Sequence, residues 1–125
     1  MAELGGTIGG TNGKVFDDDP RLKRLHEYVE ESYSEHISLG KAAGIAALES
    51  SYFSSYFRAR VGINFTDWLR QVRIRKAMEL MKSRDFGITE VAEEVGFRDL
   101  RTFERAFKKY TLTTPREFKK SVVPV

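Results

Sequence analysis

The most informative part of this sequence is the ten-residue segment ITEVAEEVGF at residues 88–97, with Phe103 and Phe107 shortly after it. Its apolar residues have the spacing of a short helix. Gly96 stands where the chain must turn, because glycine tolerates a positive φ or a close approach of two helices. Phe103 and Phe107 are four residues apart, so they share one face of a longer second helix. A helix-turn-helix unit is therefore predicted over about residues 88–110.

The same pattern occurs once more, about fifty residues earlier. The matched pairs are Ala43 with Ala92, Leu48 with Phe97, Phe53 with Phe103, and Phe57 with Phe107, at offsets of 49 and then 50. A first helix-turn-helix unit is therefore predicted over about residues 39–61. Ala47 takes the position of Gly96 in this unit, so its turn is less favourable.

The segment between the units predicts a long helix over about residues 65–83 that changes its buried face midway. At about 100° per residue, two apolar sets fall on nearly opposite sides. They are Phe65, Trp68, Leu69 and Val72, then Ile74, Ala77, Met78 and Met81. A helix buried all round in one larger core is the alternative, but charged residues interrupt it: Arg70, Arg73, Arg75 and Lys76. We expect a linker helix between two small helical subdomains.

The rest of the chain is also predicted as helices, which makes the domain all-α with seven helices and two homeodomain-like repeats. An apolar stripe indicates a first helix over about 21–35, with Asp19 as its N-cap, and Thr114-Pro115 begins a short last one. The helix of the 88–97 segment is expected to start after Thr89 or Asp85. Residues 1–19 hold five glycines and few apolar groups, so we expect a flexible tail or linker there and the domain at 20–125.

Composition excludes several classes of protein. The apolar fraction of 41% is that of a globular chain, and no apolar run approaches the roughly 18 residues that span a membrane. The amino terminus has no signal-peptide pattern, and the absence of cysteine fits a reducing compartment, so we expect a cytoplasmic protein without a membrane partner. Residues 50–125 hold 16 Lys and Arg against 9 Asp and Glu. Such an excess attracts polyanions, although charge alone also fits an ordinary solvated surface.

No catalytic, cofactor or metal site is expected. The only histidines, His26 and His36, lie away from any cluster of carboxylates. The sequence has no glycine-rich phosphate loop, no pairing of a nucleophile with a base and no metal-ligand spacing. We therefore expect a protein that is not an enzyme.

The outward faces of the longer helices offer polar side chains at matching positions. They are Ser51, Ser54, Ser55 and Arg58 in the first unit, and Arg101, Glu104, Arg105 and Lys108 in the second. Arginine can bond guanine at two atoms, serine can donate or accept, and Glu104 can accept from cytosine or merely hold a neighbouring arginine. An ordinary solvated face is the competing interpretation, most seriously for the three serines.

From about Ser38 to Phe118 the sequence resembles the DNA-binding domain of the AraC/XylS family of bacterial transcription regulators. The resemblance rests on the 88–97 segment, the run FERAFKK at 103–109, Pro115, and the matching runs of the first unit and linker helix. It implies sequence-specific binding of double-stranded operator DNA by two recognition helices in successive major grooves. Base-reading residues would be Ser51, Ser54, Ser55, Leu100, Arg101, Thr102, Glu104 and Arg105. Phosphate contacts would come from Arg58, Arg98, Lys108 and Lys109.

Three residues depart from the family pattern, and one alternative function stays open. Ala47 and Leu112 replace usual glycines, and Glu49 replaces a usual capping serine. RNA polymerase is the expected protein partner, and the two-unit fragment is expected to be monomeric. The alternative is a helical interaction module whose basic face meets an acidic protein or an RNA. Such a module would bind DNA weakly and without regard to sequence, and the inward position of the aromatics counts against RNA.

Overall fold

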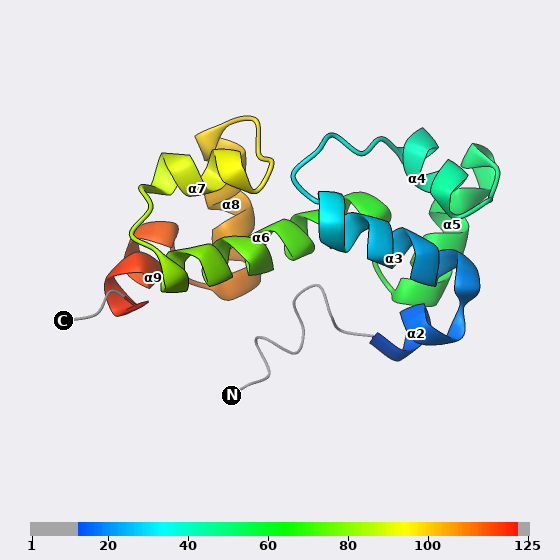
Figure 1. The fold of residues 1–125 in the computed structure, drawn as a ribbon, viewed down its shortest axis with the longest axis horizontal. Coiled ribbons are helices and arrows are strands. Elements are labelled where there is room, and N and C mark those ends of the chain that lie inside the picture. The colour runs from blue at the N-terminus through cyan, green and yellow to red at the C-terminus, as the bar shows by residue number, and fades with distance from the viewer. Residues whose placement is uncertain (1–12, 123–125) are drawn as a thin grey trace.

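The computed structural model describes residues 13–122, which contain eight α-helices and no strand, so the predicted all-α fold is confirmed. The helices are α2 (Gly13–Asp18), α3 (Pro20–Ser32), α4 (Leu39–Ile45), α5 (Ser50–Val61), α6 (Phe65–Ser83), α7 (Ile88–Glu94), α8 (Leu100–Thr111) and α9 (Pro115–Val122). The long helix α6 runs along the middle of an elongated molecule (Figure 1). Helices α2 to α5 surround its first half, and α7 to α9 surround its second half.

The sequence repeat is a structural repeat. Helix α7 begins 49 residues after α4, and α8 begins and ends 50 residues after α5. The two turns close with equivalent backbone hydrogen bonds: the Leu48 amide donates to the Ala43 carbonyl at 2.9 Å, and the Phe97 amide to the Ala92 carbonyl at 3.0 Å. In both turns the chain passes through a positive φ, 60° at Ala47 and 102° at Gly96. Alanine therefore adopts the conformation for which glycine is usual.

Helix α6 is shared between two cores, as the change of face predicts. Its first half contributes Phe65, Trp68, Leu69 and Val72 to a core with α2 to α5, in which Phe53 and Phe57 are fully buried. Its second half contributes Ile74, Ala77 and Met81 to a core with α7 to α9, in which Phe103 and Phe107 are fully buried. The side that is buried changes between Val72 and Ile74, and both residues are 0% exposed.

The expected flexible tail is wrong for residues 13–19, and the expected count of seven helices is wrong for the same reason. Residues 13–18 form α2, and Phe16 is 2% exposed because its ring stacks on His26 at 4.7 Å and lies 5.2 Å from Trp68. Phe16, with the half-buried Val15 beside it, thus anchors a segment whose other side chains are polar. The part of the expected tail at residues 1–12 lies outside the described residues.

Asp19 joins α3 to α5 as well as capping α3. Its carboxylate accepts hydrogen bonds from the backbone of Arg21 and Leu22, from the Tyr56 hydroxyl at 2.6 Å and from Arg60 Nη1 at 2.9 Å. Burial opposes ionisation of this carboxyl, yet these hydrogen bonds and the charge of Arg60 together lower its pKa. The N-cap prediction for Asp19 is confirmed; the tie to α5, 37 residues away, lies beyond what capping predicts.

Two helix ends differ from their predicted positions. Helix α3 ends at Ser32 and not near residue 35, because the Glu35 amide turns back to bond the Ser32 carbonyl at 3.0 Å. The N-cap of α7 is Gly87, not Thr89 or Asp85. The Glu90 carboxylate reaches back to accept from the Gly87 amide at 3.0 Å, which satisfies a donor at the start of the helix.

The segment between α3 and α4 braces the second turn against α6. A Cβ at Gly96 would lie 2.8 Å from the Ser34 carbonyl oxygen and 2.9 Å from its Cα, so glycine is required there for space as well as for φ. Arg73 of α6 donates to the carbonyls of Tyr33 and Glu35, each at 2.7 Å. The chain connecting two helices of the first unit is thereby fixed against the second unit.

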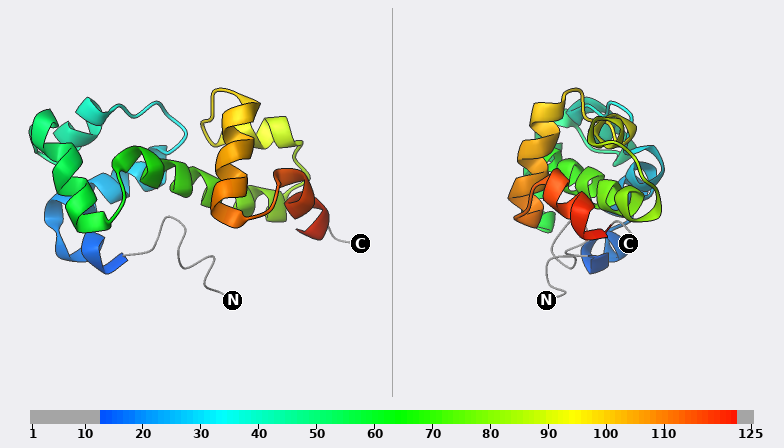
Figure 2. Two further views of the ribbon diagram at one scale, coloured as in Figure 1. Left: turned by 180° about the vertical axis from the view of Figure 1, so that it is seen from behind. Right: turned by 90° about the vertical axis from the view of Figure 1, so that its left-hand side faces the viewer.

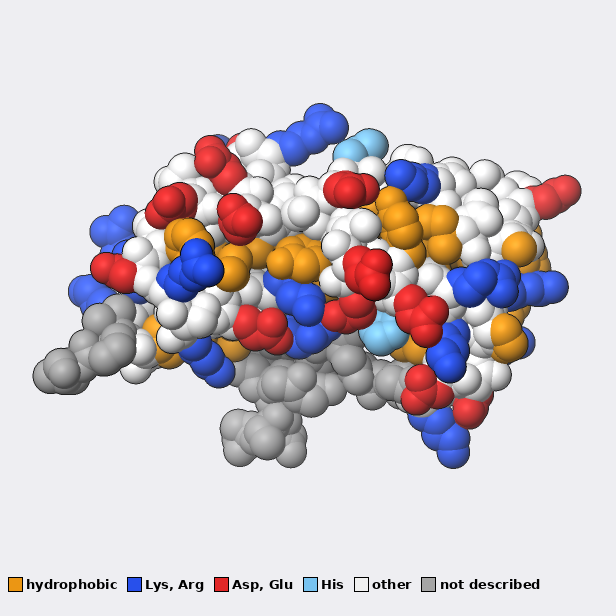
Figure 3. Space-filling model, viewed as in Figure 1, with side chains coloured by type: hydrophobic (Ala, Val, Ile, Leu, Met, Phe, Trp, Pro, Cys, Tyr) orange, Lys and Arg blue, Asp and Glu red, His pale blue; other side chains and the backbone are white. Residues whose placement is uncertain are grey.

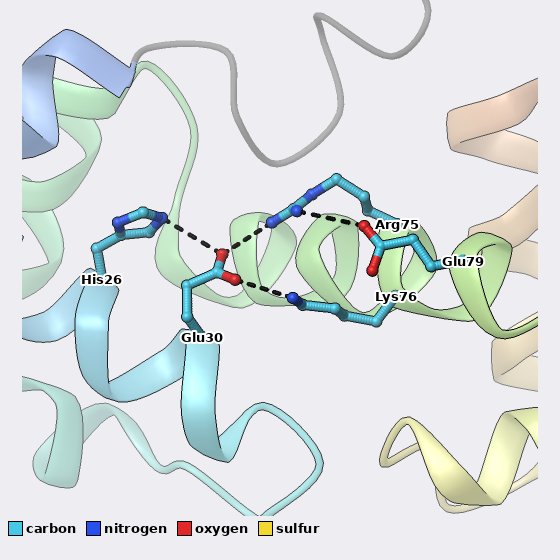
Figure 4. A network of polar contacts seen from close by, with 5 residues as sticks. All are labelled: His26, Glu30, Arg75, Lys76 and Glu79. Atoms are coloured by element: carbon cyan, nitrogen blue, oxygen red, sulfur yellow. Dashed lines mark hydrogen bonds and ion pairs between the residues drawn. The ribbon is translucent and has the colours of Figure 1, made fainter.

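A second brace holds α3 along α6 near the position where the buried face changes (Figure 4). The Glu30 carboxylate contacts Arg75 Nη2 at 2.8 Å and Lys76 Nζ at 2.9 Å, and His26 Nε2 lies 3.4 Å away. Burial opposes ionisation of Glu30, but the hydrogen bonds from Lys76 and Arg75 prevail and lower its pKa. The orientation of α6 relative to the first unit is thus set by charge as well as by packing.

Three glycine-to-alanine variants separate these constraints. Gly96→Ala should lower the free energy of unfolding by roughly 2–4 kcal/mol, since both the positive φ and the contact with Ser34 oppose a Cβ. Gly62→Ala shares a φ near 100° but has no atom within 4 Å of the new Cβ, so about 1 kcal/mol is expected. Gly44→Ala, inside α4 with open space, should stabilise the protein slightly. Urea unfolding followed by circular dichroism tests this order; equal effects at Gly96 and Gly62 would contradict the proposed crowding.

The carboxylate of Asp19 should make the free energy of unfolding fall at acidic pH. Its folded-state pKa is lowered, so its stabilisation is complete above roughly pH 4–5 and is lost as the pH falls through the folded-state pKa. Asp19→Ala should cost about 2 kcal/mol at pH 7, because a helix cap is lost and the Tyr56 hydroxyl loses its partner. Asp19→Asn keeps the cap without the charge, so its deficit relative to the wild type should shrink towards pH 2. The fluorescence of Trp68, the only tryptophan, reports the unfolding; a deficit that stays constant with pH would refute this role.

Candidate nucleic-acid interface

Helix α5 presents the predicted serine-rich face to solvent. Phe53, Phe57 and Val61 turn inward, and this leaves Ser51, Ser54, Ser55 and Arg58 exposed. The Ser55 hydroxyl donates to the Tyr52 carbonyl of its own helix at 3.2 Å, so its oxygen remains available as an acceptor. Within residues 13–122 the side chains of Ser51 and Ser54 make no hydrogen bond. This face can therefore both donate and accept.

The start of α5 carries two further features. Glu49 is the N-cap, but its side chain makes no capping hydrogen bond. The carboxylate is exposed beside the helix N-terminus, where it would repel a nearby phosphate. Tyr52 is 53% exposed, although it contacts the ring of Tyr56 at 5.5 Å. Tyr52 is not among the predicted base-reading residues, although its place directly before the buried Phe53 indicates that it points away from the core.

Helix α8 presents a strongly basic face at the equivalent positions. Phe103, Ala106 and Phe107 turn inward, and Arg101, Glu104, Arg105, Lys108 and Lys109 are exposed. In the described part of the chain no ion pair joins Glu104 to Arg101 or Arg105, so both guanidinium groups are available to a ligand. Lys108 Nζ contacts the Leu112 carbonyl at 3.4 Å, and Lys109 lies over the ring of Tyr110.

The N-terminus of α8 limits what two of the predicted residues can do. Asp99 accepts from the Thr102 amide at 2.7 Å and from the Thr102 hydroxyl at 3.0 Å. The hydrogen bond from the Thr102 backbone lowers the pKa of Asp99, so this carboxylate remains charged as a cap. Thr102 is half-buried and its hydroxyl proton is engaged, which leaves its methyl group and an oxygen lone pair for any ligand. Leu100 is 37% exposed, and Arg98 is also exposed.

Leu112 ends α8 in the left-handed conformation, with φ of 64°. Its amide bonds the Lys108 carbonyl at 2.9 Å, as the Gly62 amide bonds the Arg58 carbonyl at the end of α5. The C-cap geometry is therefore kept without glycine. The Leu112 side chain is 77% exposed.

The two helices that carry these faces lie on the same side of the molecule. Seen from behind, α5 and α8 stand apart, one in each unit, with α6 running between them (Figure 2). On the other face acidic side chains gather over α3 and α7 (Figure 3). Among the predicted residues, those exposed on α8 are more basic than those exposed on α5.

Two other kinds of site have no counterpart in the described part of the chain. None of its helices is long and apolar enough to cross a membrane. Residues 13–122 contain no group of three or more His, Cys, Asp or Glu side chains able to hold a metal ion. The hollows on the surface of these residues have mixed polar and apolar linings, and each of them includes arginine side chains.

Comparison with known proteins gives consistent matches. A family model described as a helix-turn-helix domain matches residues 42–121. The transcriptional regulatory protein YesN of Bacillus subtilis is 35% identical over 101 residues, which cover 78% of this chain and 27% of that protein. The chain spans about a seventh to a third of the length of the curated relatives it matches.

Solved structures share the architecture. An AraC-type regulator from Chromobacterium violaceum superposes with a TM-score of 0.79 at 18% identity, over 86% of this chain and 96% of that one. The DNA-binding domain of AdpA, solved in complex with a target DNA, superposes with a TM-score of 0.73 at 22% identity, over 82% of this chain and 92% of that one. At these identities the likeness is one of fold. The family match covers nearly two-thirds of the sequence, and the chain therefore belongs to the AraC-type helix-turn-helix family of transcriptional regulators.

Proposed function

We propose that this domain binds double-stranded DNA sequence-specifically, with α5 and α8 in successive major grooves, and thereby regulates bacterial transcription. The observation that carries the proposal is the pair of equivalent helices, each with an exposed polar face, that stand on one side of the molecule. A helix fits the major groove, where each base pair displays a distinct pattern of donors and acceptors. The AdpA domain, which shares the fold, is bound to a target DNA in its structure and supports this use of the surface.

The two helices would read DNA differently. On α5 the readers are Ser51, Ser54 and Ser55, whose short hydroxyls require close approach to the base edges. On α8 the readers are Arg101 and Arg105, each able to bond guanine O6 and N7, together with Leu100, Thr102 and Glu104. Arg58, Arg98, Lys108 and Lys109 would contact phosphates, which position the protein without reading sequence.

The wider role follows from family membership. A regulator of this kind works in the cytoplasm and acts on RNA polymerase at the promoter. The described fragment would bind as a monomer, because its two units can occupy adjacent grooves spaced about 34 Å apart. No enzymatic activity is proposed, since the family and the fold are those of transcriptional regulators.

Selection of bound sequences from random duplex DNA at two salt concentrations tests the proposal. A motif with two blocks about one helical turn apart is the expected result. A single block would mean that one helix alone reads bases. Binding without sequence preference that vanishes as salt rises would favour an interaction module that meets an acidic protein.

Arginine variants should reveal the asymmetry between the helices. Arg101→Ala or Arg105→Ala should weaken binding to the selected duplex by about 1–3 kcal/mol and relax the preference for guanine under α8. Ser54→Ala should cost less, because a serine makes fewer contacts than a two-pronged guanidinium. Fluorescence anisotropy against the selected duplex and single-base variants measures both effects.

Arg84→Ala is the matched control for these variants. Arg84 is exposed just beyond the end of α6, where its guanidinium lies over Phe86, and it lines none of the hollows around Arg70. It should leave base preference unchanged. Equal losses on every duplex for Arg101→Ala and Arg105→Ala would instead identify these side chains as phosphate anchors.

A further inference from the structure

Arg70 of α6 lies at the meeting point of three neighbouring hollows between the two units. One is bounded by the segment after α3 and the start of α8, one by the side of α8, and one by the starts of α4 and α6. All three hollows share Arg70, and we call this group of hollows the central trough. Its charged and titratable lining comprises Arg70, Arg73, Arg98, Arg105, Lys109 and His36, together with Asp99.

The positive charge of the central trough is only partly balanced. Asp99 is engaged as the cap of α8, and Asp67 lies 3.7 Å from Arg70 Nη1, a long contact for an ion pair. Arg70 keeps 43% of its side chain exposed. Five arginine and lysine side chains thus line a surface with few acidic partners. By contrast, Arg75 and Lys76 on another side of α6 each contact the Glu30 carboxylate at less than 3 Å.

Arg73 makes this imbalance sharper. Its guanidinium donates to two backbone carbonyls, and no carboxylate pairs with it among residues 13–122. Burial and the nearby charge of Arg70 lower its pKa, which indicates that two cations crowd one another here. The guanidinium stays protonated, and its two neutral carbonyl acceptors do not cancel its positive charge. An anion placed beside Arg70 would relieve the repulsion.

The position of the trough identifies that anion. It lies between the two units, and its lining runs from the segment after α3 and the starts of α4 and α6 to the stripe of Thr102, Arg105 and Lys109 on α8. Helices α5 and α8 stand on one side of the molecule with α6 between them (Figure 2). When the two helices enter successive grooves, the sugar-phosphate backbone that separates the grooves must cross this region. Phosphate is also the commonest partner of arginine in protein–DNA complexes.

We propose that Arg70, flanked by Arg98 and Lys109, binds the DNA phosphates that lie between the two grooves, and so acts as a central phosphate clamp. This inference rests on the proposed function. Arg73 acts as a positioning residue: it fixes the segment after α3 through the Tyr33 and Glu35 carbonyls and adds charge behind Arg70. The clamp contributes affinity on every sequence and holds the two reading helices in register on the duplex.

Phosphate neutralisation combined with mutation tests the clamp. Duplexes carrying the selected two-block motif are synthesised with single methylphosphonates, which remove one phosphate charge, at each position between the blocks. The proteins are the wild type, Arg70→Gln, Arg70→Lys and the control Arg84→Gln, each checked for folding by Trp68 fluorescence. Binding is measured by anisotropy over a range of salt concentrations.

For Arg70→Gln we expect roughly tenfold weaker binding on all duplexes and a salt slope reduced by about 0.9. A methylphosphonate at the central position should weaken the wild type and Arg70→Lys but add little to Arg70→Gln. Arg84→Gln should behave as the wild type does. Added inorganic phosphate at constant ionic strength should compete only weakly, since a free ion lacks the adjoining contacts.

The outcomes separate the clamp from the proposed function. If the wild type binds the two-block motif and Arg70→Gln shows the same affinity, salt slope and response to methylphosphonates, the clamp is overturned and the proposed function stands. Binding without sequence preference but with the Arg70-dependent salt slope would support the clamp and overturn sequence reading. The clamp would be overturned as a DNA site if the wild type bound no duplex. It would also be overturned if free phosphate competed as strongly as unlabelled duplex does.

Discussion

Helix α6 is the constraint on which the rest of the structure depends, because one rigid helix is buried in two separate cores. The buried side changes between Val72 and Ile74, so the two units are placed on nearly opposite sides of the same rod. A helix of 19 residues is about 28 Å long, and it transmits position without bending unless its hydrogen bonds are interrupted. The relative orientation of α5 and α8 is therefore set by the phase of apolar residues along α6.

Packing along one helix would still leave the units free to shift, and polar contacts restrain them. Arg73 draws the segment after α3 towards the second unit, and the backbone of Ser34 then lies where only a glycine fits at position 96. Glu30 holds α3 along α6 from the other side through Arg75 and Lys76. The hydrogen bonds of Arg73 to the Tyr33 carbonyl and of Arg75 to Glu30 are partly buried and involve a charged group, and such hydrogen bonds are stronger than neutral ones. The outcome is a pair of reading helices in a defined relation.

Identical backbones carry dissimilar surfaces. Helices α5 and α8 begin and end fifty residues apart and close their turns with the same hydrogen bonds, yet one face is rich in serine and the other in arginine. Burial of two phenylalanines on each inner face preserves the helix and leaves the outer face free to differ. The central trough between them adds charge that belongs to neither helix-turn-helix unit. Affinity and sequence reading can thus reside in different parts of one surface.

Much of this arrangement was predictable from local pattern. The offsets of 49 and 50 predicted two units, and the phase change in residues 65–83 predicted a linker helix. The phenylalanine pairs four residues apart predicted which positions are exposed, since the helical period indicates which side of a helix is apolar. The same reasoning assigned a positive φ to Gly96 and a cap to Asp19. It failed for residues 13–18, where a polar composition concealed one anchoring aromatic, Phe16. Other contacts join residues that are far apart in the sequence. The Asp19–Tyr56 hydrogen bond and the hydrogen bond of Arg73 to Tyr33 span 37 and 40 positions, and the trough at Arg70 brings together residues from several helices. Periodicity records that a side is buried or exposed but not which distant neighbour meets it, so only the tertiary structure could decide those contacts.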